Sequence, residues 1–453
     1  MLRWRRLAGL MAVVAIGLGS ASTSARAAGP AVAAQRSSVA HAAVLEIHYS
    51  SPLLVRAGER VRLPVDVVCA TAGGEACPAR ASLAISEEGS WRTVGAQASP
   101  QLQFDLTGPA MRALGDSPDA SMSFFLRAEA DGVKASLPAA EAATPLQLYI
   151  VRDIPVVRVP PIAFGQASRG RTVLSLPWGS GPTKAGIRIG RESATVGPSS
   201  FDVDRLGRIH LLDPLQGRLA VFSGGRLQSQ TALTVTSTSD VALTARGDSY
   251  AVDQAGSSLT ARRIDPSGRS DQPMVLGPGI LSEVRTDGER AYVEALPLDA
   301  WRAIEAPTSP TVIRSQIPGL TAARPLAGGS GLLRAGTESS VKLGTVSGGH
   351  VHDAVELRSR QRLGEVALAE PDGHGGYVAV LHVWREAPAP ADRYQFVHVI
   401  GDRVVSSFAL SDRRFAECSP LSKFRLGLDG KLYQLTSSPT GMRVVRYDLG
   451  GES

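Results

Sequence analysis

The chain has 453 residues, of which 43% are hydrophobic and 20% charged, and its formal net charge is +6. Residues 1–27 carry four Arg and no acid, so their removal lowers the net charge from +6 to +2. A balance this close to neutral gives no support to a nucleic-acid-binding protein, whose surface is strongly basic.

The first residues are typical of a secretory signal peptide, which residues 1–27 are predicted to form. Three Arg precede the uncharged, mostly apolar run 7–19, and Ala25-Arg26-Ala27 has the small-x-small pattern of a cleavage site. The run is shorter than the about 20 apolar residues of a membrane span, and no Cys follows it to carry a lipid. We expect export to the periplasm, the cell surface or the medium, with no stable membrane anchor after cleavage. A twin-arginine signal at Arg5-Arg6 is the less favoured alternative, because the flanking residues match poorly.

Residues 28–43 are rich in Ala, Ser and Gly and have no apolar period, which predicts a linker. From residue 44 onward, short runs of alternating character separated by Gly, Pro and Asp predict β-strands. These runs cover residues 45–49, 60–68, 82–85, 101–106, 123–128 and 147–151. Their spacing favours an immunoglobulin-like β-sandwich over residues 44–152, with a short helix at 109–114.

Two of the three Cys lie close together in this first domain. Cys69 and Cys77 flank a short loop that contains Gly73 and Gly74. In an oxidising compartment this spacing predicts a disulfide across a hairpin, with two buried thiols as the alternative. Two Cys without a second pair are too few for a zinc site. Cys418 has no obvious partner and is expected to be a small buried side chain.

The second domain is predicted to cover residues 156–453, behind a Pro-rich connector at 153–161. Residues 201–213 recur as residues 241–253, so that Gly207 aligns with Gly247 and Asp213 with Asp253. A supersecondary unit repeated at this period is typical of a propeller or a solenoid. The Gly are expected in tight turns, and Asp213 is expected to bond the backbone that follows it.

The repeat can be followed to the end of the chain. Further candidate turn glycines are Gly288, Gly329, Gly375 or Gly376, and Gly430, which gives six units with room for four strands each. The last unit ends at residues 443–449, which correspond to a third strand, so residues 171–176 are predicted to supply its outer strand. A seven-bladed ring, in which residues 156–195 form the extra blade, is the alternative.

One unit matches a known repeat pattern. Residues 197–204, 207–213 and 217–222 resemble an NHL-type repeat, whose pattern has a small-residue start, an apolar-x-Val-Asp strand, a Gly turn, an Ile-Tyr-Val-x-Asp strand and an Arg-Val-x-x-Phe strand. The resemblance implies a six-bladed β-propeller. Similar modules mostly bind proteins, glycans or small ligands, and some are enzymes. The pattern departs at His210, which replaces the usual aromatic, and at Leu215-Gln216, which replaces the common Asn.

The sequence offers several candidate site residues without a catalytic motif. It has no Gly-x-Ser-x-Gly elbow, P-loop or Cys-x-x-Cys motif. If a propeller enzyme held Ca²⁺ or Zn²⁺ in its central channel, the candidates to face it are Asp202, Asp204, Glu283 and Arg425.

The histidines and tryptophans allow two further hypotheses. His350 and His352 lie on one face of a predicted strand, and the following unit carries His374, His382 and His398, which makes a zinc cluster conceivable. We favour turn and surface positions for them, because no third ligand has a fixed relation to the first two. Trp178, Trp301 and Trp384 are the aromatics best suited to ligand contact, although large aromatics mostly fill cores.

These patterns together favour an all-β protein with a β-sandwich followed by a six-bladed propeller. The predicted function is that of an exported, non-catalytic binding or scaffold protein that uses the propeller loops to bind a protein, a glycan or a small ligand. The alternative is a metal-dependent hydrolase or lyase with its site in the channel. We assign no catalytic or metal-ligating residue and no cofactor from the sequence.

Overall fold

The computed structural model describes most of the chain beyond the first 41 residues. The described residues are 42–49, 54–87, 89–98, 101–137, 141–143, 145–164, 170–190, 194–296, 300–304, 323–386, 389–411, 415 and 422–449. The predicted signal peptide, nearly all of the predicted linker, and Cys418 lie outside them. No helix in the described ranges has the length and apolar character of a membrane span.

The N-terminal part forms two sheets that share one hydrophobic core. The first sheet has the order β1-β3-β6, and the second has the order β2-β9-β7-β4-β5 with β8 beside β7. Leu63 and Phe104 from the first sheet pack in the same core as Leu83 and Phe124 from the second. The strands are β1 (Ala42–Tyr49), β2 (Leu54–Arg56), β3 (Arg62–Thr71), β4 (Arg80–Glu87), β5 (Ser90–Ala98), β6 (Gln101–Asp105), β7 (Asp119–Ala130), β8 (Val133–Leu137) and β9 (Leu146–Val151).

The alternation in the sequence accounts for this arrangement. Along β3, Leu63, Val65 and Val67 are buried while Pro64 and Asp66 between them are exposed, as expected for a strand with one face on a core. The predicted helix is present as α1 (Thr107–Leu114). One boundary is corrected, because β1 begins at Ala42, inside the predicted linker. The sequence analysis also missed β2, β5 and β8.

Six further sheets follow among the described residues from Val156 onward. Four of them have four strands each, in the orders β12-β13-β14-β15, β16-β17-β18-β19, β27-β28-β29-β30 and β11-β33-β32-β31. The other two are β20-β21-β22 and β10-β26-β25-β24-β23. The boundaries between the repeated units were therefore predicted correctly, since the strands of each unit form one sheet.

The strands of these sheets are β10 (Val156–Arg158), β11 (Arg171–Pro177), β12 (Ser200–Val203), β13 (Ile209–Asp213), β14 (Arg218–Ser223), β15 (Arg226–Ala232), β16 (Ser239–Leu243), β17 (Ser249–Ala255), β18 (Ser258–Ile264), β19 (Met274–Pro278), β20 (Ile280–Thr286) and β21 (Ala291–Leu296). They continue with β22 (Ala300–Ala303), β23 (Arg324–Pro325), β24 (Gly331–Gly336), β25 (Ser340–Ser347), β26 (His350–Arg358), β27 (Arg362–Pro371), β28 (Gly376–Arg385), β29 (Ala391–Ile400), β30 (Arg403–Leu410), β31 (Phe424–Leu426), β32 (Leu432–Ser438) and β33 (Gly441–Tyr447).

The six sheets form a closed ring, which is the arrangement of a β-propeller. The first strands of neighbouring sheets are in contact where β31 meets β12, β12 meets β16, β16 meets β20, and β27 meets β31. The remaining neighbours touch through β22 and β23 and through β24 and β27. Every sheet therefore has a neighbour on both sides.

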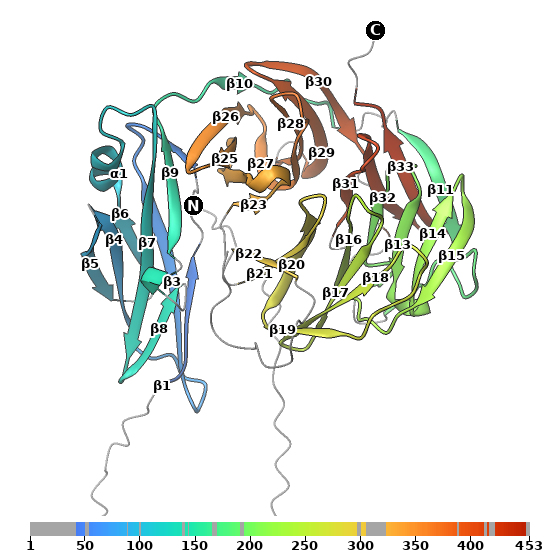
Figure 1. Ribbon diagram of the computed structural model, residues 1–453, viewed down its shortest axis with the longest axis horizontal. Helices are drawn as coiled ribbons and strands as arrows, with labels where there is room; N and C mark the ends of the chain where they lie inside the picture. Colours follow the sequence, from blue (N-terminus) through green and yellow to red (C-terminus); the bar gives the residue numbers. More distant parts are fainter. Residues whose placement is uncertain are drawn as a thin grey trace, which may run out of the picture. The chain divides into compact units, whose positions relative to one another are not determined.

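The ring is closed by the strand that the sequence predicted. β11 pairs antiparallel with β33, with Leu174 opposite Val444 and Leu176 opposite Met442, and Figure 1 shows the two strands side by side. Leu174, Leu176, Met442 and Val444 are all buried in one core. The early strand β11 thus covers the edge of the last sheet, which would otherwise be exposed to other chains.

The predicted connector has a structural role of its own. β10 lies within residues 153–161 and pairs in parallel with β26, as a fifth strand of that sheet. Since β10 joins the sheet of β26 and β11 joins that of β33, the described part of residues 156–195 forms no sheet of its own. The seven-bladed alternative is therefore wrong for this part of the chain.

The recurring spacing of Gly and Asp between the repeats of this chain has a local structural cause. Gly207, Gly247, Gly288 and Gly430 have φ values of 71°, 92°, 98° and 73°, the left-handed region that side chains with a Cβ avoid. Each lies in the turn between the first and second strands of a sheet. Asp213 accepts hydrogen bonds from the backbone N–H groups of Gly186, at 2.9 Å, and Gln216, at 3.3 Å, so its predicted structural role is confirmed.

Candidate functional site

The first strands of the six sheets bring charged side chains together at the centre of the ring. We call them the axial cluster: Asp202 on β12, Asp240 on β16, Glu283 and Arg285 on β20, Arg324 on β23, Glu370 on β27 and Arg425 on β31. Contacts between sheets that are not neighbours place them at the centre. Arg425 of the last sheet reaches Val284 of the third, and Arg285 of the third reaches Glu370 of the fifth.

Arg425 connects four first strands through its guanidinium group. Its Nε donates to the carbonyl of Phe201 at 2.9 Å, and Nη1 donates to the carbonyl of Val284 at 3.1 Å. Nη2 donates to the carbonyl of Val241 at 2.8 Å and to Oδ1 of Asp240 at 2.6 Å. The side chain is 3% exposed, so these bonds form away from bulk water.

Asp240 is the carboxylate partner of Arg425 and is itself fully enclosed, with a side chain 0% exposed. Besides the guanidinium, it accepts hydrogen bonds from the backbone N–H groups of Val241, at 2.8 Å, and Val284, at 2.7 Å. The hydroxyl groups of Ser200 and Ser422 also donate to it. Both oxygens therefore already have several donors, as a buried carboxylate requires.

The other two guanidiniums of the cluster are also paired with carboxylates. Arg285 pairs with Glu283 and lies 3.6 Å from Glu370. Arg324 pairs with the same Glu370 and donates to the carbonyl of Ala369 at 3.2 Å. Each of the three Arg thus has a carboxylate partner. The pairs of Arg285 and Arg324 span the third to the fifth sheets, and the pair of Arg425 with Asp240 joins the last sheet to the second.

Asp202 differs from the other carboxylates of the cluster. Its oxygens accept hydrogen bonds from the backbone N–H groups of Val203 and Leu243, each at 2.8 Å, and it forms no ion pair with a described residue. Burial raises the pKa of Asp202 from 3.8 to about 7, and the hydrogen bonds from Val203 and Leu243, followed by the charge of Arg285, only partly oppose this.

The axial cluster does not fit Ca²⁺ or Zn²⁺. Its carboxylates already accept hydrogen bonds from guanidinium, backbone or hydroxyl donors, and three guanidiniums stand among them, so a cation would meet like charge. Within the described ranges, no group of three or more His, Cys, Asp or Glu side chains is arranged to hold a metal ion.

Three of the four predicted channel residues, Asp202, Glu283 and Arg425, belong to the axial cluster. Asp204 does not: it caps the turn after β12 by accepting from the backbone N–H groups of Leu206 and Arg208, each at 2.9 Å. The sequence analysis missed Asp240, Arg285, Arg324 and Glu370. A signal existed for Asp240 alone, which is the one charged residue of the short strand β16.

The predicted histidine candidates form no group that could hold a metal ion within the described ranges. His350 and His352 are on β26 and exposed, and Nδ1 of His350 is 3.3 Å from Asp119. His382 and His398 are each within 3.0 Å of a separate Asp, and His374 is in an exposed turn.

The three Trp candidates mostly pack against the protein. Trp301 is buried, and Nε1 of Trp178 donates to the carbonyl of Ser438 at 2.8 Å. The guanidinium of Arg362 lies 4.2 Å from the ring centre of Trp384.

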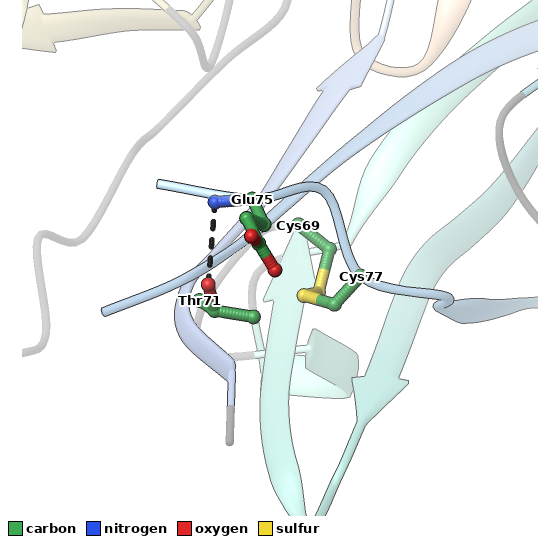
Figure 2. The surroundings of a disulfide bond; sticks show 4 residues. All are labelled: Cys69, Thr71, Glu75 and Cys77. Carbon is green, nitrogen blue, oxygen red and sulfur yellow. Dashed lines mark hydrogen bonds between the residues drawn. A yellow bond between two sulfur atoms is a disulfide. The ribbon is translucent and has the colours of Figure 1, made fainter. Parts of the chain in front are cut away.

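The predicted disulfide is present in the N-terminal part (Figure 2). Cys69 and Cys77 are bonded, with Cα atoms 5.2 Å apart. The backbone N–H of Cys77 donates to the carbonyl of Cys69 at 3.1 Å, and that of Glu75 donates to Oγ1 of Thr71 at 3.2 Å. The bond therefore crosses a tight hairpin, as expected.

Comparisons with known proteins give distant similarities. No family model matches the chain, and no curated protein matches it. Among solved structures, virginiamycin B lyase from Staphylococcus aureus aligns over 58% of this chain and 99% of its own, with 8% identity and a TM-score of 0.33. The PQQ-bound aldose sugar dehydrogenase from Streptomyces coelicolor aligns over 59% and 99%, with 14% identity and a TM-score of 0.33. A protein of unknown function from Bacteroides caccae aligns over 49% and 93%, with 13% identity and a TM-score of 0.32. Similarity at this level carries no information about activity, and the β-propeller rests on the strand pairing described above.

Proposed function

We propose that this protein is an exported, non-catalytic binding or scaffold protein whose propeller loops bind a protein, a glycan or a small ligand. The proposal rests on the ion pairs that the chain's own side chains form at the centre of the ring. Where a channel ligand would lie, three Arg and three carboxylates of the chain pair with one another. Because these groups are already paired with one another, we place recognition on the loops at the faces of the ring.

The finer assignment of the two domains is part of the proposal. We regard the ring as a six-bladed propeller of NHL type, because six sheets follow the repeat and the unit at residues 197–222 matches that pattern. We regard the N-terminal pair of sheets as an immunoglobulin-like β-sandwich, because they share one core at the expected size.

One loop face has features suited to a partner. Leu206 and Leu428 lie in the first turns of neighbouring sheets, and the backbone N–H of Leu428 donates to the carbonyl of Val203 at 3.0 Å. Leu206 is 78% exposed, which is unusual for a large apolar side chain. Arg208 and Lys431 stand in the same turns with partly exposed side chains. We propose that this face makes the contact.

Export is supported by the leader and by the disulfide. Residues 1–27 have the pattern of a signal peptide, and the bond between Cys69 and Cys77 is of the kind that persists in oxidising compartments. The periplasm, the cell surface and the medium all meet this condition.

The competing function is a metal-dependent hydrolase or lyase, and metal analysis separates the two. We expect the purified mature chain to hold far less than one Ca²⁺ or Zn²⁺ per molecule, and calorimetric titration with either ion to give no saturable heat. One equivalent of metal that is lost in an Asp240→Asn variant would refute the proposal.

The loop face is tested by a matched pair of variants. The double variant Leu206→Asp with Leu428→Asp should lose binding to partners found on a glycan array or by cross-linking to exported proteins. Val405→Asp, at an exposed position on β30, should keep it. Equal binding by both variants would show that the partner uses another surface.

A further inference from the structure

The axial cluster contains one more carboxylate than guanidinium groups. Arg425 is paired with Asp240, Arg285 with Glu283, and Arg324 with Glu370. Asp202 is the fourth carboxylate, and no described cation forms an ion pair with it. If all seven groups were ionised, the axial cluster, in which Asp202, Glu283 and Glu370 are partly exposed, would carry one negative charge in excess.

The charged and titratable groups around Asp202 come from every strand that surrounds it. His210 on β13 is opposite it in the strand pairing. Nε2 of His210 in turn lies 3.6 Å from Asp204 in the turn after β12. The neighbouring first strands carry Asp240 on β16 and Arg425 on β31, and the sheets beyond them carry Glu283 and Arg285 on β20, Arg324 on β23 and Glu370 on β27. The three Arg have their bonds to other carboxylates, so they offset the charge of Asp202 only at a distance.

A proton would neutralise Asp202 without breaking its bonds. The backbone N–H of Leu243, in the neighbouring sheet, donates to one oxygen, and that of Val203 donates to the other. A protonated carboxyl group keeps acceptor capacity on its oxygens. The bond from Leu243 connects the first and second sheets at the ring centre, so it is retained in the neutral form while the excess charge is removed.

We propose that Asp202 in the axial cluster binds one proton in the folded ring, and that this proton makes the association of the first and second sheets depend on pH.

The direction of the effect follows from the bound proton. Burial raises the pKa of Asp202 from 3.8 to about 7. Between these values the folded chain holds a proton that the unfolded chain has lost, so the contribution of Asp202 to stability falls as pH rises. The contribution of Asp202 to stability is therefore complete below pH 3.8 and is lost as pH rises through about 7.

The test is urea unfolding of the full mature chain from pH 4 to 8, for the wild type, Asp202→Asn and the control Asp271→Asn. Asp271 is in a loop with its side chain 55% exposed. We expect the folding constant of the wild type, relative to Asp202→Asn, to fall by up to about tenfold per pH unit in the range where one bound proton is lost. Asp271→Asn should follow the wild type. Parallel pH profiles for the wild type and Asp202→Asn would overturn the proposal.

A local readout keeps the test decisive if Asp202→Asn fails to fold. Hydrogen exchange of β16 in the wild type, corrected for the intrinsic pH dependence of exchange, reports on the N–H of Leu243 and its neighbours. We expect protection in residues 239–243 to decrease between pH 5.5 and 8 while that of the core of β4 stays constant. Equal protection of β16 at both pH values would overturn the proposal.

Discussion

Replacing Arg425 with Met removes a buried guanidinium group while keeping a long side chain in its place. In the structure, Arg425 donates to the carbonyls of Phe201, Val241 and Val284 and to the carboxylate of Asp240. The substitution therefore leaves three carbonyls without this donor and a buried carboxylate without its counter-charge. The four acceptors belong to three different sheets.

The expected loss in the free energy of unfolding depends on the hydrogen-bond donors that each acceptor retains. Removing one partner of a buried ion pair costs about 3–5 kcal/mol. Asp240 retains the N–H groups of Val241 and Val284 and two hydroxyl donors, so we expect the lower part of this range, about 3–4 kcal/mol. Adding Asp240→Asn should cost less than its single effect, with a coupling of about 1–3 kcal/mol.

Urea unfolding at pH 7, followed by fluorescence and by circular dichroism, measures these values for both single variants and the double variant. The control is Arg269→Met, whose side chain is 82% exposed and pairs only with Asp265 at the surface, and we expect no measurable change. A loss below about 1 kcal/mol for Arg425→Met, as for a surface ion pair, would refute the reasoning. Additive single effects would do the same.

Three further outcomes test other parts of the fold. Removing the disulfide by Cys69→Ser with Cys77→Ser should lower the free energy of unfolding by about 2–3 kcal/mol, because the unfolded chain gains loop entropy. In calorimetry the variant and the reduced wild type should melt at the same temperature, below that of the oxidised protein. Identical melting of all three would contradict the expectation. Leu176→Asp places a charge beside Met442 in the pairing of β11 with β33 and should cost about 3 kcal/mol or more; unchanged hydrogen-exchange protection of β33 would show that β11 does not hold that edge. Arg127 and Ser136 hold the pKa of Glu141 at about 2 instead of 4.5, so the stabilisation is present above pH 4.5 and is lost as pH falls toward 2. The stability difference between the wild type and Glu141→Gln should therefore be constant above pH 5 and vanish near pH 2, and a constant difference at all pH values would exclude this origin.

Much of the ring was predictable because its repeats share turn chemistry. Gly207 and Gly247 recur at a fixed spacing since both turns need a positive φ. From them the phase of the strands follows, and with it the missing outer strand of the last sheet, which β11 supplies. The fourth and fifth units were harder to place: both Gly328 and Gly329 have a positive φ, and Gly375 has one while Gly376 does not.

The candidate site was less accessible to sequence reasoning. A charged residue such as Arg425 or Asp240 reads as solvent-facing when its partner is far away in the chain, and period-2 alternation does not distinguish the ring centre from the sheet faces. Residues 240 and 425 meet only because the ring closes. Asp202 and Arg425 were named as channel candidates, whereas the partners that define their roles required the folded structure.

The pairing of β11 with β33 also has a kinetic consequence. Residues 171 and 446 lie opposite each other in this sheet. The sheet therefore forms only when the start and the end of the propeller sequence come into contact. Contacts between distant parts of a chain are slow to form, because a long loop must close first. A nascent chain that still lacks residues 441–447 cannot complete the ring, whatever its earlier sheets have done.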